Sequence, residues 1–223
     1  TQLTTEVATV NSYSRQIAEL NQSIVIAQSS INQPANDLLD QRDQLVSELN
    51  KLIKVTTTTN SDGSFNVFFG TGQQLVVGTQ VMTMTATPSA ADPSKFAVGL
   101  SNAGGNQELP ESLITGGSIG GLLKFRSESL DRTQNDLGRN AASMALTFNS
   151  QHFLGQDLLG QSIGDADFEA DFFTISQPRV LANNRNTSAA VLTASLAAPS
   201  IDGRYTLTRD AAVAAPFTFT LTR

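Results

Sequence analysis

The chain has 223 residues, of which 39% are hydrophobic and only 6% aromatic, and it contains no cysteine and no tryptophan. This length suffices for one large or two modest domains, and the lack of cysteine excludes disulfides, thiol catalysis and cysteine-based zinc sites. The formal net charge of -6 opposes the counterion release that drives nucleic-acid binding, so no nucleic-acid partner is expected.

No run of about 18 apolar residues is present, and residues 1–6 contain neither a basic leader nor an apolar signal core. We therefore expect no membrane-spanning segment and no cleaved signal peptide. A chain without thiols can enter an oxidising space without mispairing, which is compatible with an extracellular location.

A long helix is expected at residues 2–31. Apolar residues recur there every seven positions, at Leu3, Val10, Ile17, Ile24 and Ile31. Such spacing places one apolar seam along a helix, and a rise of about 1.5 Å per residue makes it a rod of roughly 45 Å. Because the pattern begins without a capping residue, we expect the natural chain to continue upstream of Thr1.

A second helix is expected at residues 36–54, after an interruption at 32–35 that contains Pro34. Asn36 is its predicted capping residue, and acidic side chains follow in the first turn. Its apolar stripe consists of Leu38, Leu39, Leu45, Val46, Leu52 and Ile53. The short connection predicts that the two helices form an antiparallel hairpin.

The composition changes after Val55 to threonine, glycine and alternating apolar residues. A turn at 61–63 separates two strand-like runs, 55–59 and 64–69. The apolar residues that share faces are Phe65, Val67 and Phe69, then Leu75 and Val77, Met82 and Met84, and finally Phe96, Val98 and Leu100. This alternation predicts a small antiparallel sheet of four to five strands at 55–115.

A third helix is expected at 119–151, after the glycine-rich loop 116–121. Its seam consists of Leu123, Leu130, Leu137 and Met144, with Ala141, Ala145 and Phe148 beside it. We expect this seam to pack on the first two helices. Charge pairs of Glu128 with Arg132 and of Asp136 with Arg139 are expected on the outer face.

Strand signals return beyond residue 175, at Tyr205, Leu207, Phe217, Phe219 and Leu221, with a possible hairpin turn at Asp202-Gly203. The chain stops within this pattern, so we expect a truncated β domain or one completed elsewhere. The predicted fold class is α+β: a long antiparallel helical bundle at 1–54 and 116–165, an inserted β region at 55–115, and the start of a second, mostly β domain at 166–223.

Few side chains suggest chemistry. His152 is the only histidine, which excludes multi-histidine metal sites, and we interpret it as a residue that interacts with the last carbonyls of the third helix. The alternating carboxylates Asp165, Asp167, Glu169 and Asp171 could hold calcium if they shared one extended face, but they depart from an EF-hand and are interpreted as a solvated loop. A glycosidase pair among them would need an aromatic-lined cleft.

Two other features have a plain structural interpretation. The loop 116–121 precedes a helix but lacks a P-loop ending, so close backbone packing is the expected reason for its glycines. Lys124, Arg126, Arg132 and Arg139 could form an anion-binding strip, yet interspersed acidic residues neutralise it. We therefore expect no catalytic residue, no metal and no cofactor.

Five segments together resemble the family of bacterial flagellar hook-associated protein 1. They are residues 36–45 (NDLLDQRDQL), 116–126 (GGSIGGLLKFR), 135–138 (NDLG), 148–152 (FNSQH) and 171–173 (DFF). The resemblance covers about residues 1–175 in consistent order. Residues 160–170 look like an insertion, and residues 176–223 carry no motif of the family.

The resemblance implies a structural protein at the junction of the flagellar hook and filament. It implies export without a cleaved signal peptide, assembly outside the cell, and packing against the hook protein, neighbouring junction proteins and further copies of itself. The terminal segments that polymerise are missing here, so residues 1–223 are expected to be monomeric. Two alternatives remain: a secreted, adhesin-like module that binds host protein or glycan, and a hydrolase that uses Asp167 and Glu169.

Overall fold

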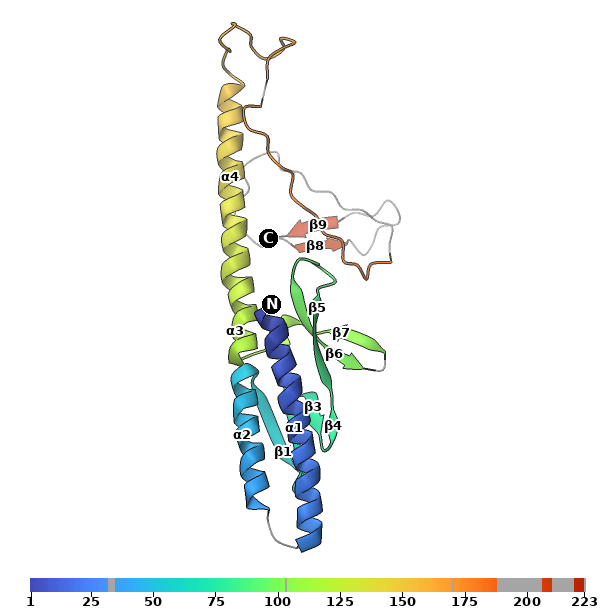
Figure 1. Cartoon of the computed structure of the whole chain (residues 1–223). Coiled ribbons are helices and arrows are strands. Elements are labelled where there is room, and N and C mark those ends of the chain that lie inside the picture. Colours follow the sequence, from blue (N-terminus) through green and yellow to red (C-terminus); the bar gives the residue numbers. More distant parts are fainter. Residues whose placement is uncertain (32–34, 103, 170, 188–205, 210–218, 223) are drawn as a thin grey trace. The chain divides into compact units, whose positions relative to one another are not determined.

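The computed structural model describes residues 1–31, 35–102, 104–169, 171–187, 206–209 and 219–222 (Figure 1). The chain separates into two compact units. The first contains Thr1–Arg132 and Leu181–Val191, and the second contains Thr133–Val180 and Leu192–Arg223. Helices and antiparallel sheets occur together, so the predicted α+β class is confirmed.

The first unit begins with the predicted helical hairpin. Helix α1 (Gln2–Ile31) has the predicted bounds, and α2 (Asn36–Leu52) packs beside it in the opposite direction (Figure 1). The predicted α1 seam is confirmed where its side chains are described, because Leu3, Val10, Ile17 and Ile24 are buried. None of the described helices is both long and apolar enough to cross a membrane.

Both ends of α2 differ from the prediction. Asn36 is not the capping residue but the first helical one, since Ala35 precedes the helix and no side chain caps it. At the other end, Ile53 adopts extended backbone, so the helix stops at Leu52 instead of continuing to Lys54. The Asn50 Oδ1 then accepts a hydrogen bond from the Val55 N–H at 3.0 Å, which leads the chain into the first strand.

The β region contains more strands than predicted. Within the described residues of 55–115 there are two antiparallel sheets, one of four strands and one of three, instead of one sheet of four to five. The strands are β1 (Val55–Thr59), β2 (Phe65–Phe69), β3 (Gln73–Val77), β4 (Gln80–Val81), β5 (Thr83–Pro88), β6 (Phe96–Asn102) and β7 (Gly105–Glu108). They pair in chain order, so each sheet is a simple meander.

A β-bulge changes which side chains of β3 face the core. The register between β2 and β3 shifts after Val67, which pairs with Val76, while Phe68 pairs with Gln74. An extra residue breaks the period of two, so Leu75 and Val76 are both buried. The expectation that Val77 shares a face with Leu75 is therefore wrong, and Val77 is 37% exposed.

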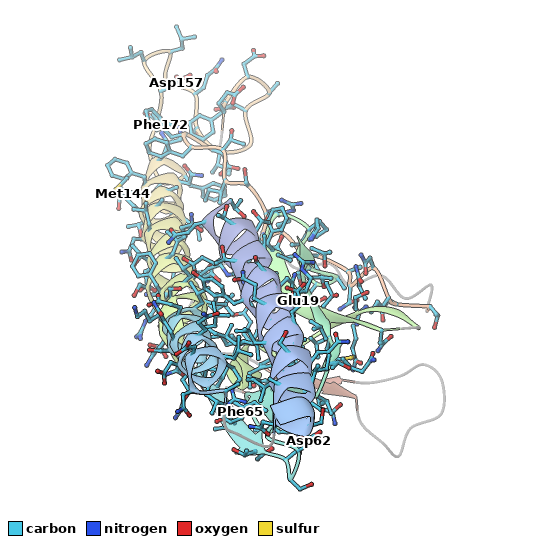
Figure 2. The ribbon with its side chains drawn as sticks, turned by 60° about the horizontal axis from the view of Figure 1, so that its bottom comes forward. Glu19, Asp62, Phe65, Met144, Asp157 and Phe172 are labelled. Atoms are coloured by element: carbon cyan, nitrogen blue, oxygen red, sulfur yellow. The ribbon has the colours of Figure 1, made fainter. Side chains whose placement is uncertain are left out.

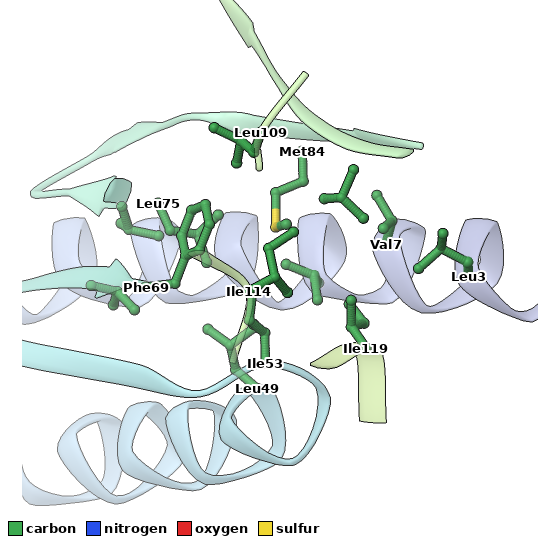
Figure 3. Packing of buried hydrophobic residues seen from close by; sticks show 14 of the residues in the cluster. Leu3, Val7, Leu49, Ile53, Phe69, Leu75, Met84, Leu109, Ile114 and Ile119 are labelled. Carbon is green, nitrogen blue, oxygen red and sulfur yellow. The ribbon is translucent and has the colours of Figure 1, made fainter. Parts of the chain in front are cut away.

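One core lies between the hairpin and the sheets, and Figure 3 shows side chains from distant segments meeting there. Helix α1 contributes Leu3 and Val7, α2 contributes Leu49, and Ile53 follows directly after it. The strands and later segments contribute Phe69, Leu75, Met84, Leu109, Ile114 and Ile119. Of the predicted stripe of α2, Ile53 is fully buried and Leu38, Leu45 and Leu52 are half-buried, whereas the fully buried Leu49 is not among the predicted residues.

The third predicted helix is interrupted. After a 3₁₀ turn at Glu111–Leu113, α3 (Gly117–Phe125) runs into a π-helical segment, η2 (Arg126–Leu130), and then into α4 (Asp131–His152). A π turn holds more residues than an α turn, so a residue seven positions after Leu123 no longer lies on the same face. Leu123 is buried in the first unit, whereas Leu130 is 45% exposed, and the predicted continuous seam is wrong.

The last described strands are β8 (Thr206–Arg209) and β9 (Phe219–Thr222), which pair antiparallel with Leu207 opposite Leu221. The strands expected around Leu207 and Phe219 are thus confirmed. Tyr205, Phe217 and the turn at Asp202-Gly203 lie outside the described residues.

Candidate interaction surfaces and the contacts that shape them

The side-chain amides of two asparagines on α1 form hydrogen bonds with backbone groups of both sheets. The Asn11 amide donates to Met84 O and accepts from Met84 N–H, both at 2.8 Å. Asn21 accepts from Phe65 N–H at 2.9 Å and donates to Phe65 O at 2.8 Å and Gly78 O at 2.7 Å. Each amide pairs with a strand residue as another strand would, so α1 is held in a defined register against both sheets.

Sequence reasoning missed these contacts, although a signal was present. Asn21 follows Ile17 by four positions and precedes Ile24 by three, so it lies on the apolar seam of the helix. A polar residue on a buried stripe must find a hydrogen-bond partner. The spacing therefore predicts that Asn21 forms a buried hydrogen bond, but it does not identify the strand that provides the partner.

Arg42 fastens α2 to the turn between β1 and β2. Its guanidinium carbon lies 3.3 Å from the centroid of the Phe65 ring, and Nη1 donates to Gly63 O at 2.7 Å. The side chain is almost fully buried, and its Nε lies 3.6 Å from the carboxylate oxygen Oδ1 of Asp43. Burial lowers the pKa of Arg42, but a guanidinium remains charged at any ordinary pH, so the turn receives a buried cation.

Replacing Arg42 by alanine is expected to lower the free energy of unfolding by about 2–3 kcal/mol, because packing, a charged hydrogen bond and a cation–π contact are lost together. Asp43→Ala is the matched control. Its carboxylate is 61% exposed, and its loss is expected to change stability by less than about 0.5 kcal/mol. Urea unfolding followed by circular dichroism measures both, and equal losses would contradict this account of Arg42.

Glu108, the last residue of β7, connects this strand of the three-stranded sheet to the residues that follow β5. Its Oε1 accepts from the Ser89 hydroxyl at 2.7 Å, its Oε2 accepts from the Ala90 N–H at 3.1 Å, and Arg185 lies 3.8 Å away. The backbone hydrogen bond from Ala90, with smaller contributions from Ser89 and Arg185, lowers the pKa of Glu108. The ionised carboxylate therefore stabilises the folded chain.

A Glu108→Gln variant is expected to be less stable than the parent at neutral pH and to approach it in acid. Because the folded-state pKa is lowered, the stabilisation is fully present above the ordinary value of 4.5 and is lost as the pH falls through the folded-state pKa. Thermal unfolding midpoints at a series of pH values test this. Ser89→Ala, which removes one donor, should give an intermediate curve, and a constant gap at every pH would reject the linkage.

The glycine loop packs closely against backbone, as predicted, and the backbone that it contacts is the end of α2. Gly116 and Gly117 have φ angles of +70° and +65°, and a Cβ at Gly117 would lie 2.5 Å from the carbonyl of Leu52. A shallow groove beside the loop is lined by both Glu111 and Glu128. These carboxylates do not favour a phosphate ligand.

The predicted cationic strip is largely occupied by internal contacts. Arg126 donates to Phe96 O at 2.7 Å and pairs with Glu111 at 2.5 Å. Lys124 lies 3.9 Å from Glu128, and Arg139 lies 3.3 Å from Asp136. This pairing agrees with the interpretation of a neutralised, charged face.

Helix α4 carries an apolar face in the second unit. Leu137 is 70% exposed, Met144 59% and Phe148 55%. Figure 2 shows Met144 pointing away from its helix. These side chains recur at seven and four residues, so they lie along one side of the helix. A regular apolar face of this kind indicates a surface that packs on another helix.

The end of α4 is covered by the chain that follows it. The imidazole of His152 stacks on Phe168, with centroids 5.2 Å apart, and its Nε2 lies 3.0 Å from Glu169 O. The predicted contact with the last carbonyls of its own helix is replaced by this contact across the loop. Asn149 adds a backbone clasp, since it accepts from Phe173 N–H and donates to Phe173 O, both at 2.8 Å.

The acidic loop does not form the extended segment that a calcium site would need. The chain turns after Ser162, whose N–H donates to Asp165 Oδ2 at 2.7 Å, and Phe168 N–H donates to Asp165 O at 3.3 Å. Among the residues that the structure describes, no three His, Asp or Glu side chains gather as a metal site would require.

These features define an α+β domain built on a long helical hairpin, with packing surfaces as its prominent sites. The family described as "Flagellar hook-associated protein FlgK helical domain" matches residues 1–169. Flagellar hook-associated protein 1 of Salmonella typhimurium is 42% identical over 198 residues, which cover 88% of this chain and 34% of that protein. Its counterpart in Escherichia coli K12 is 42% identical over 179 residues, covering 79% of this chain and 32% of that protein.

The flagellar hook junction protein FlgK from Burkholderia pseudomallei has a solved structure that superimposes with a TM-score of 0.84 at 38% identity. It covers 99% of this chain, which spans 38% of that protein. The chain therefore belongs to the FlgK family of flagellar hook-associated proteins. It spans about a third of the length of the curated relatives that it matches.

Proposed function

We propose that this protein is a structural component of the bacterial flagellum that joins the hook to the filament by subunit packing, without enzymatic activity. The observation that carries the proposal is the 42% identity over 88% of the chain to flagellar hook-associated protein 1. All the curated relatives compared bear that name, including one from Buchnera aphidicola at 30% identity. The adhesin-like alternative has no support from these relatives.

The domain organisation predicted from the sequence becomes part of this proposal. Residues 1–54 and 116–165 would form a helical rod, 55–115 an inserted β region, and 166–223 the start of an outer β domain. The exposed face of α4 supports the rod, because Leu137, Met144 and Phe148 are placed to pack on a further helix. The rod sets the spacing between subunits along the flagellar axis.

The proposed partners are the hook protein, neighbouring junction proteins and further copies of the same protein, outside the cell. Export would proceed without a cleaved signal peptide. Residues 1–223 alone are proposed to be monomeric. Sedimentation of this segment tests the last point, and a stable oligomer at all concentrations would reject it.

Electron microscopy of cells that lack the whole gene, with an assay for flagellin in the medium, tests the function. Hooks without filaments and leaked flagellin are expected. Normal filaments would reject the junction role. Replacing Leu137 and Met144 by serine in the full-length protein should reproduce the defect, whereas Thr133→Ser on the same helix should not.

A further inference from the structure

A leucine-tipped turn follows α4 in the second unit. The carboxylate Oδ1 of Asp157 accepts hydrogen bonds from the backbone N–H of Leu159 and of Gln161, both at 2.8 Å. The Asp157 N–H in turn donates to Gln161 O at 2.9 Å. Asp157, labelled in Figure 2, thus holds both sides of the turn. We call residues 154–161 the leucine finger.

The apolar side chains of the leucine finger point into solvent. Leu154 is 79% exposed, Leu158 105% and Leu159 83%. Single exposed leucines are ordinary on protein surfaces, but three strongly exposed leucines within six residues are unusual, and concentrated exposed apolar surface is a mark of interaction sites. The turn is closed by its own hydrogen bonds, so the leucines are presented in a fixed arrangement.

The segment that follows ties the finger to the helix end. Asn149 clasps the backbone of Phe173, and His152 stacks on Phe168. Both ends of the segment between His152 and Phe173 are therefore held at the last turn of α4. A pre-ordered protrusion loses less conformational entropy on binding than a free loop does.

The charge around the finger favours one kind of partner. No lysine or arginine occurs between Arg139 and Arg179. The same stretch contains the carboxylates Asp157, Asp165, Asp167, Glu169 and Asp171. A segment with this net negative charge is repelled by anionic lipid headgroups and attracted to a cationic protein surface.

We propose that the leucine finger inserts Leu158 and Leu159 into an apolar socket on another protein chain, and that lysine and arginine side chains rim this socket. Burial of the two leucines supplies the favourable free energy of the insertion. The carboxylates of the same stretch attract basic side chains, which is the reason for the cationic rim. The contact does not depend on which assembly the protein joins.

Photocrosslinking in the full-length protein tests the contact in cells. A benzophenone amino acid replaces Leu158, and Asn140, exposed on α4, is the control position. The expected result is a crosslink from position 158 to a different chain, mapped to apolar residues with lysine or arginine beside them. A crosslink within the same chain, a lipid adduct, a site without basic residues, or equal yields at both positions would each overturn the proposal.

Charge reversal gives a second readout. Asp167→Lys with Glu169→Lys is expected to reduce the crosslink yield at position 158 by about tenfold, as for lost electrostatic complementarity. Asp167→Asn with Glu169→Gln should give an intermediate loss. An unchanged yield in the lysine variant would refute the cationic rim. Filaments are scored separately in the gene deletion, so failure of the junction role and failure of the finger contact are distinguishable.

Discussion

Replacing Gly117 by alanine is expected to lower the free energy of unfolding of the first unit by about 3–5 kcal/mol. Its φ of +65° is a conformation that side-chain-bearing residues rarely adopt. A Cβ there would also lie 2.5 Å from Leu52 C and O and 2.6 Å from Ile53 N. These are backbone atoms that cannot rotate aside, so the start of α3 would have to move away from the end of α2.

Gly121→Ala is the matched control for Gly117→Ala, because Gly121 lies inside the same helix with open space around it. Alanine is favoured over glycine in a helix by up to about 1 kcal/mol, so this variant should be as stable as the parent or more so. Urea unfolding followed by circular dichroism measures both variants. A loss below about 1 kcal/mol at Gly117 would show that the α2–α3 contact yields easily.

Hydrophobic periodicity is sufficient to predict where helices occur along the chain, and for α1 also where the helix begins and ends. The apolar residues that recur every seven positions from Leu3 to Ile24 are buried along α1, and this pattern predicts the bounds of that helix correctly. The turn at 61–63 was also recognisable, since Gly63 supplies a φ of +80° between β1 and β2. Such features depend on local spacing and turn chemistry, which a single sequence contains.

Features that depend on contacts between distant segments were not predicted. The bulge that turns Val77 outward and the π segment that displaces Leu130 each shift a regular pattern by part of a turn or by one residue. Periodicity assumes an unbroken element, so it continues straight through such shifts. The same limit applies to Arg42, because its contacts with Phe65 and Gly63 join α2 to a turn about twenty residues later in the chain, which helical spacing does not indicate.

Of the two candidate surfaces, the apolar residues of α4 could be predicted from the sequence and the leucine finger could not. The seam of Leu137 and Met144 was found, but it was assigned to the core of the first hairpin, whereas these side chains are exposed in the second unit. The leucines at 154–159 were overlooked, because three apolar residues in a loop match neither helical nor strand periodicity. Their meaning depends on exposure, which a sequence does not report.

Replacing Asn21 by leucine is expected to cost about 2–4 kcal/mol of unfolding free energy. Leucine has a similar shape, so the core around Asn21 keeps its volume while three hydrogen bonds disappear. The variant leaves the N–H and C=O of Phe65 and the carbonyl of Gly78 without their partner, and each half-buried group left unpaired costs on the order of 1 kcal/mol.

A graded series of variants tests whether the hydrogen bonds of the two asparagines, and not helix propensity, determine this loss of stability. Asn11→Leu removes only the two bonds to Met84 and should cost about 1–2 kcal/mol. Gln22→Leu, exposed beside Asn21, should change stability by less than about 0.5 kcal/mol. Urea unfolding of the three variants gives the order, with hydrogen exchange at Phe65 N–H as a local probe. If Asn11→Leu cost as much as Asn21→Leu, the extra bond to Gly78 would contribute nothing to stability. If neither variant cost more than Gln22→Leu, the register of α1 against the sheets would depend on apolar packing alone.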